Sequence, residues 1–156
     1  MKNRPTVGEI LQAKGVSRRG FLKYCATTAS LLALPPSMIP RIAKAIESAR
    51  RPSVIWLSFQ ECTGCTESLT RSASPTVEGL IFDAISLDYH HTLQAAAGDQ
   101  AEEARHAAME ENDGGYLVLV DGSIPMKNPG YSTIAGISNV DMLMDTVKGA
   151  AAVVAI

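Results

Sequence analysis

The sequence predicts an α/β domain with a parallel sheet covered by helices, preceded by an N-terminal export signal. Short apolar runs alternate with helix-compatible segments between residues 53 and 156, which is the pattern of βαβ units. Charge is also divided unevenly, because residues 1–45 carry eight Lys or Arg and one acid, whereas residues 46–156 carry six and fifteen. A basic leader therefore precedes an acidic domain.

The leader has the layout of a secretory signal. Residues 17–23 (SRRGFLK) place paired arginines before an uncharged stretch at 24–40, and this resembles the twin-arginine consensus. The small residues of Ala43–Ala45 fit the positions that a signal peptidase inspects, so residues 1–45 are predicted to be removed and Ile46 to become the first mature residue. The uncharged stretch is too short, and too interrupted by a proline pair, for a membrane-spanning helix.

Use of the twin-arginine route itself predicts a cofactor, because this route carries folded proteins and serves those whose cofactors are inserted in the cytoplasm. The alternative is an amphipathic N-terminal helix with an accidental arginine pair. That alternative also requires the flanking Ser17 and the Phe-Leu-Lys at 21–23 to be accidental.

The first predicted element of the domain is a strand at 53–59 (SVIWLSF), whose β-branched, nearly all apolar residues indicate burial on both faces. A helix follows from Cys62 through Arg71 and is limited by Pro75. The remaining expected elements are strands at 80–87, 116–120 and 151–156 and helices at 100–112 and 140–148. Because the sequence stops inside an apolar strand, we expect it to be a truncated piece of a longer protein.

Composition excludes two classes of protein. The acidic domain lacks the clustered basic face that nucleic-acid binding requires. The chain has three cysteines, Cys25 in the leader and Cys62 and Cys65 in the domain, which are too few for a disulfide scaffold.

Cys62 and Cys65 form a CxxC motif at the carboxyl end of the first predicted strand, the edge at which parallel sheets bind ligands. Their spacing brings two thiols close enough to hold one metal centre. CxxC alone leaves an iron-sulfur cluster, structural zinc, a thioredoxin-like redox pair and a motif without chemistry all open.

The surrounding residues 61–68 (ECTGCTES) resemble the proximal-cluster signature of the small subunits of periplasmic, uptake-type (group 1) nickel-iron hydrogenases. The resemblance continues at 85–90 (ISLDYH), 120–125 (VDGSIP) and 149–156 (GAAAVVAI). It implies that residues 46–156 are the incomplete, flavodoxin-like N-terminal domain of such a subunit.

The resemblance also implies the site. Cys62 and Cys65 match the first two of four cysteine ligands to a proximal 4Fe-4S cluster, and the other two, with further iron-sulfur clusters, are expected beyond Ile156. Gly64 stands where some oxygen-tolerant relatives have an extra cysteine, which points to the ordinary, oxygen-sensitive type. The fragment alone is expected to bind a cluster weakly or not at all and to be inactive.

As a class, such a subunit transfers electrons in the reversible oxidation of H2 to two protons and two electrons, while the nickel-iron site lies in the large subunit. The implied partners are that large subunit, the twin-arginine translocase and a membrane cytochrome b, with no nucleic acid. The implied location is the periplasm, with membrane association through the complex.

Two other functions stay open. A periplasmic thioredoxin-like thiol oxidoreductase would use Cys62 to attack a disulfide and Cys65 to resolve it. An exported binding module would hold zinc or a disulfide at the same pair. The first needs no twin-arginine signal, and metal analysis separates the second from an iron-sulfur protein.

Other candidate residues receive structural interpretations. Glu67 is favoured as an acid that stabilises the first turn of a helix over a proton carrier or a contact to the large subunit. Glu61 flanks the cysteines and could tune the potential of a cluster through its charge, but an exposed loop acid is the more frequent explanation, and no role is assigned to it. The residues of 121–125 form either a border of the cluster site or a simple Gly-Pro turn. The remaining candidates are interpreted as surface or interface histidines and as core or partner-facing methionines: His90, His91, His106, Met142 and Met144.

Overall fold

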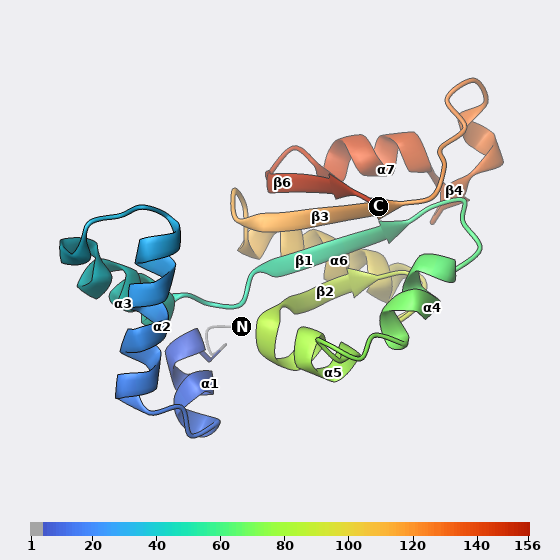
Figure 1. Cartoon of the computed structure of the whole chain (residues 1–156). Helices are drawn as coiled ribbons and strands as arrows, with labels where there is room; N and C mark the ends of the chain where they lie inside the picture. The colour runs from blue at the N-terminus through green and yellow to red at the C-terminus, as the bar shows by residue number, and fades with distance from the viewer. Residues whose placement is uncertain (1–4) are drawn as a thin grey trace. The chain divides into compact units, whose positions relative to one another are not determined.

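The computed structural model describes residues 5–156, which fall into two compact units divided between Arg51 and Pro52 (Figure 1). Each unit has its own hydrophobic core. The boundary between the units falls a few residues after the predicted signal cleavage position, which itself lies within a helix. Cleavage at that position stays a prediction.

The N-terminal unit consists of three α-helices and a 3-10 turn: α1 (Val7–Ala13), α2 (Arg18–Leu31), η1 (Pro36–Met38) and α3 (Ile39–Ser48). Ser17 caps α2 by accepting a hydrogen bond from the backbone N–H of Gly20, so the paired arginines open this helix. Phe21, Cys25 and Ala43 form the buried core of the N-terminal unit. No helix among residues 5–156 has the length and apolar composition needed to cross a membrane.

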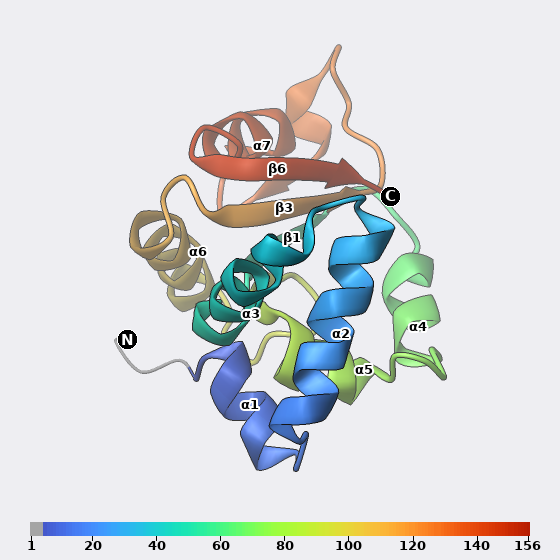
Figure 2. The same ribbon diagram turned by 60° about the vertical axis from the view of Figure 1, so that its left-hand side comes forward.

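The C-terminal unit is built on a four-stranded parallel sheet in the order β2-β1-β3-β6 (Figure 1), of which Figure 2 shows β3 and β6 side by side. Its strands are β1 (Ser53–Ser58), β2 (Ser86–His90), β3 (Tyr116–Asp121) and β6 (Ala150–Ala155). Its helical segments are α4 (Gly64–Thr70), α5 (Val77–Gly79), η2 (Leu80–Ala84), α6 (Asp99–Glu111), η3 (Pro129–Tyr131) and α7 (Asn139–Thr146). The predicted α/β architecture with a parallel sheet and flanking helices is confirmed.

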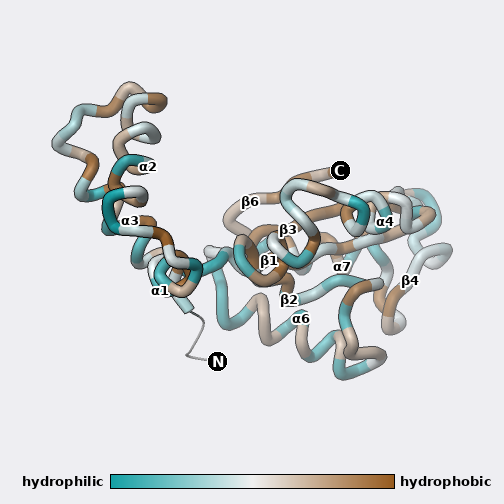
Figure 3. The backbone as a smooth tube through the Cα atoms, turned by 60° about the horizontal axis from the view of Figure 1, so that its bottom comes forward, coloured by the Kyte–Doolittle hydropathy of each residue, from teal (hydrophilic) through white to brown (hydrophobic). Residues whose placement is uncertain are grey.

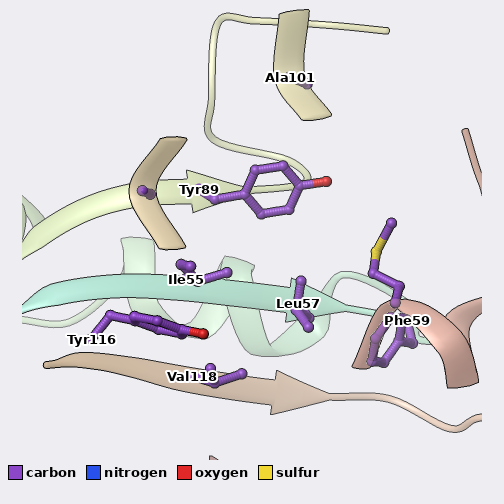
Figure 4. Packing of buried hydrophobic residues seen from close by; sticks show 9 residues of the cluster. Ile55, Leu57, Phe59, Tyr89, Ala101, Tyr116 and Val118 are labelled. Carbon is purple, nitrogen blue, oxygen red and sulfur yellow. The ribbon is translucent and has the colours of Figure 1, made fainter. Parts of the chain in front are cut away.

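Helices cover both faces of this sheet. Figure 3 shows α6 on the side opposite α4, as expected when the chain reverses its direction along the sheet after β2. Apolar side chains of β1, β2 and β3 pack against α6 and α7, and most of this core is visible in Figure 4. The core cluster comprises Ile55, Leu57, Phe59, Tyr89, Ala101, Ala108, Tyr116, Val118 and Met142.

The strand predicted at 80–87 is wrong in position. Residues 77–84 form helical turns, α5 followed by the wider turn η2, and the strand occupies Ser86–His90 instead. Thr76 caps the helical segment by accepting a hydrogen bond from the Gly79 N–H, and a short apolar run does not by itself distinguish a strand from a helix. The pairing of Ser86 N–H with the Pro52 carbonyl oxygen at 2.9 Å then fixes where β2 begins beside β1.

A small antiparallel hairpin was not predicted. It pairs β4 (Thr133–Ile134) with β5 (Ile137–Ser138). Its two turn residues, Ala135 and Gly136, have φ values of 51° and 78°, which suits a tight two-residue turn. Two-residue strands are too short to produce a visible alternation in the sequence.

Candidate metal centre

The cysteine motif lies in the loop that joins β1 to α4. Cys62 is exposed in this loop, and Cys65 is half-buried in the first turn of α4. Thr63 precedes α4 with a left-handed backbone, φ 66°, which turns the chain sharply between the strand and the helix. The predicted placement of the CxxC at a strand-to-helix junction is confirmed.

Gly64 keeps space beside the first thiol. A Cβ atom at this position would lie 3.0 Å from the Cys62 Sγ atom, so any side chain here would crowd the sulfur. The glycine therefore leaves the Cys62 thiol open to a ligand.

The loop after β3 borders the cysteine loop. Gln60 and Ser123 exchange backbone hydrogen bonds at 3.2 and 3.0 Å, and the Ser123 hydroxyl also donates to the Gln60 carbonyl oxygen at 3.3 Å. Gly122 has φ 81°, and a Cβ there would lie 2.8 Å from that same oxygen, so this close approach requires glycine. Residues 121–123 therefore border the cysteine loop, while their role as a border of a cluster stays a prediction.

Asp121, the last residue of β3, is a feature that the sequence did not single out by itself. Its side chain is 1% exposed, and neither carboxylate oxygen has a hydrogen-bond partner within residues 5–156. Ser58, its neighbour in the β1–β3 register, also has a buried hydroxyl without a partner in the described chain. Buried polar atoms thus gather at the carboxyl edge of the sheet, next to the cysteine loop.

His90 does not fit the interpretation as a surface histidine, because it is the last residue of β2 and its side chain is 1% exposed. Its Nδ1 atom accepts the backbone N–H groups of Thr92 and Leu93 at 3.0 and 3.3 Å. Burial, followed by the neighbouring His91, lowers the pKa of His90, so the ring is neutral at pH 7. The proton therefore lies on Nε2, 3.3 Å from the Thr66 hydroxyl oxygen.

His91 is also withdrawn from solvent, although less completely. Its Nδ1 atom lies 2.6 Å from the Ser58 carbonyl oxygen, which can only accept, so the Nδ1–H group donates this bond. Burial lowers the pKa of His91, and its Nε2 atom has no partner within the described residues. It lines a cavity of about 480 Å³ with Ser58, Tyr89, Gln94, Gly98 and Ile134.

The other candidate residues have structural roles that do not involve the thiols. Glu67 is in the first turn of α4, as its helix-stabilising interpretation requires, and it also forms an exposed ion pair with Arg71 at 2.7 Å. Glu61 is half-buried rather than exposed. Met142 is buried in the core, whereas Met144 and His106 are exposed.

The donor set fits half of a cluster site. A 4Fe-4S cluster is held by four cysteine thiolates, and the motif supplies two. No group of three or more His, Cys, Asp or Glu side chains within residues 5–156 is arranged to hold a metal ion. The two thiols match the first two of the four cluster ligands that the sequence resemblance implies, and their binding of a cluster stays a prediction.

The fold and the cysteine motif place the chain in a known family: residues 62–156 match the model of the NADH ubiquinone oxidoreductase, 20 kDa subunit, and the chain belongs to that family. Within it, the chain is similar to hydrogenase small subunits. It is 45% identical to the hydrogenase-2 small chain of Escherichia coli (strain K12), over 94% of this chain and 40% of the relative.

Two further comparisons agree. The chain is 46% identical to the periplasmic NiFe hydrogenase small subunit of Solidesulfovibrio fructosivorans, over 91% of this chain and 44% of the relative. Its structure is similar to that of a reduced, active Ni-Fe-Se hydrogenase from Desulfomicrobium baculatum, with a TM-score of 0.65 and 30% identity over 69% of this chain and 42% of that chain. The chain therefore spans less than half the length of these relatives.

Proposed function

We propose that the chain is the cluster-bearing N-terminal part of the electron-transfer small subunit of a nickel-iron hydrogenase. The whole enzyme would oxidise H2 reversibly to two protons and two electrons, with the nickel-iron site in a large-subunit partner. The observation that carries the proposal is the position of Cys62 and Cys65 at the junction of β1 and α4, in a chain 45% identical to a hydrogenase small chain.

In this proposal, Cys62 and Cys65 bind iron of the proximal 4Fe-4S cluster through their Sγ atoms. When bound, such a cluster accepts and releases one electron at a time. Gly64 leaves room for the Cys62 sulfur, and the Asp121–Ser123 loop fixes the backbone that leads into the motif through Gln60. The two missing thiolates and the further clusters would come from chain beyond Ile156, so residues 1–156 alone would be inactive.

The N-terminal unit would be a twin-arginine signal. Its paired arginines, Arg18 and Arg19, begin α2 directly after the Ser17 cap, and both are exposed and therefore accessible to a receptor. A folded subunit would be carried to the periplasm after cluster insertion, with membrane association through a partner such as a cytochrome b. Replacing both arginines by lysine is expected to leave the protein in the cytoplasm.

A thioredoxin-like thiol oxidoreductase is the second candidate. The observation in its favour is the contrast between an exposed Cys62 and a half-buried Cys65 at the start of a helix, an arrangement that suits attack by the first thiol and resolution by the second. This candidate predicts reduction of a disulfide substrate such as insulin and no bound iron.

The test uses the complete subunit that contains this chain, purified with its large subunit under exclusion of oxygen. Iron, acid-labile sulfide and the electron paramagnetic resonance spectrum are compared for the unaltered protein, Cys62→Ser, Cys65→Ser and the control Thr70→Val, which alters an exposed residue of α4. Loss of the proximal-cluster signal in the first two variants alone supports the proposal. A full complement of iron in both, or insulin reduction that depends on Cys62, would contradict it.

A further inference from the structure

The helix that carries Cys65 has little to hold it in place. α4 has seven residues, which is too short for a helix to be stable by itself, and no side chain caps its N-terminus. Within this fully described helix, Thr66 is the one buried residue, at 3% exposed. The orientation of the Cys65 side chain therefore depends on what holds its neighbour, Thr66.

Thr66 is held by His90. The His90 Nε2–H group is directed to the Thr66 hydroxyl oxygen, with 3.3 Å between the two atoms, and both side chains are buried. The other ring nitrogen, Nδ1, is fixed by two backbone N–H groups, so the ring cannot flip without losing both bonds. The bond thus ties α4 to the end of β2, beside which it lies in Figure 1.

The sheet itself supports the histidine. Trp56 on β1 is the register partner of His90 on β2, and their rings pack with centroids 4.7 Å apart. The His90 ring is therefore held by packing against Trp56 and by hydrogen bonds at both of its nitrogens. His90 therefore provides a rigid reference point that connects the sheet to the cysteine-bearing turn.

We propose that His90 is a positioning residue for Cys65, acting through the Thr66 hydroxyl group. It does not touch a cluster or a reacting atom; it sets the rotation of the first turn of α4 and thereby the place of the second thiolate. The consequence for a bound cluster rests on the function proposed above, whereas the positioning of the thiol itself does not.

The first arm of the test needs no cluster. The alkylation rates of Cys62 and Cys65 are measured in the cluster-free chain by mass spectrometry for Thr66→Val, which removes the hydroxyl group at constant shape. We expect the Cys65 rate to rise about five-fold, the factor for loss of one buried hydrogen bond, while the exposed Cys62 changes less than about two-fold. Thr66→Ser should restore the unaltered rate. Thr70→Val, which removes an exposed hydroxyl group from the same helix, is the matched control.

A double-variant comparison assigns the effect to the His90 bond. His90→Leu should raise the Cys65 rate as Thr66→Val does, and the combination should add little. Should His90→Leu fail to fold, the Thr66→Val and Thr66→Ser pair still decides. An unchanged Cys65 rate, or an equal rise at both cysteines, would overturn the proposal because it would indicate no contact or a general loosening.

The second arm uses the complete subunit with its clusters. Thr66→Val should change the line shape of the proximal cluster and its midpoint potential at full iron content, and Thr66→Ser should return both to the unaltered values. Identical spectra in all three proteins would overturn the role of His90 in cluster geometry. Absence of any cluster in the unaltered protein would instead refute the proposed function, while the alkylation result would stand independently.

Discussion

The helices α4 and α6 flank the same sheet but are held in very different ways. α6 buries Ala101, Arg105 and Ala108 over thirteen residues, whereas α4 buries Thr66 alone over seven. α6 contributes to the main hydrophobic core, and α4 is linked to β2 through a single buried polar contact. The chain thus concentrates its packing on the side away from the cysteines.

Polar bonds reinforce this difference. On the α6 side, the Tyr89 hydroxyl donates to Glu102 at 2.6 Å, Arg105 pairs with Glu102 at 3.0 Å, and Arg105 also donates to the Thr146 hydroxyl oxygen at 2.9 Å. These bonds connect β2, α6 and α7. The α6 side of the domain is therefore its rigid half, and it can support the less tightly packed turn that carries the cysteines on the α4 side.

The largest expected effect of a single substitution is on the rigid half, at Arg105. This side chain is 1% exposed, and Arg105→Met would leave Glu102 without its charge partner. Breaking a buried pair from one side costs about 3–5 kcal/mol of the free energy of unfolding. Urea unfolding of the chain followed by circular dichroism measures this loss.

Lys148→Met is the matched control, because Lys148 pairs with Asp145 at 3.5 Å on the surface. An exposed pair contributes about 0–1 kcal/mol, so this variant should unfold almost like the unaltered chain. If Arg105→Met were no less stable than Lys148→Met, the contrast between the α6 side and the α4 side of the sheet would not be a difference in free energy of unfolding.

A smaller effect on stability is expected from pH, through His90 at the end of β2 and His91 directly after it. Burial lowers the pKa of both His90 and His91 from the ordinary value of 6.5, so the folded state binds fewer protons than the unfolded state below that pH. Stability is therefore complete above pH 6.5 and falls as the pH drops below it, by up to about 1.4 kcal/mol per pH unit for each histidine.

Urea unfolding at about pH 7.5 and about pH 5.5 measures this dependence. His90→Gln should reduce the difference between the two conditions, and His106→Gln on the exposed surface of α6 is the control substitution. A His90→Gln chain that loses as much stability on acidification as the unaltered chain would show that carboxylates, not the buried histidine, dominate the response.

The sequence predicted those features that depend on local pattern. The β-branched run at residues 53–59 predicted the strand β1, because such a run suits a strand buried on both faces. The Ala- and Glu-rich run at 100–112 predicted the helix α6. The positions of Cys62 and Cys65 at a strand-to-helix junction followed from their spacing and from the apolar run that precedes them. In each case, neighbouring residues alone carried the signal.

The features that were missed depend on residues far apart in the chain. His90 is buried because β2 pairs with β1 in the register that places it beside Trp56, and its partner Thr66 is 24 positions away. The Arg105 side chain in α6 is buried, and Thr146, 41 positions later, accepts its hydrogen bond. A single sequence contains no signal for either pairing.

The smallest expected effect is on α4, at Glu67. Its ion pair with Arg71 spans one helical turn, and the Glu67 side chain is 59% exposed, so water and salt screen the attraction. Glu67→Gln should lower the free energy of unfolding by less than about 0.5 kcal/mol, and the difference should disappear at high salt. Chemical denaturation at low and high ionic strength checks both statements. A larger or salt-independent loss would mean that α4 depends on its surface charges as well as on the Thr66–His90 contact, and the contrast with α6 would then be one of degree.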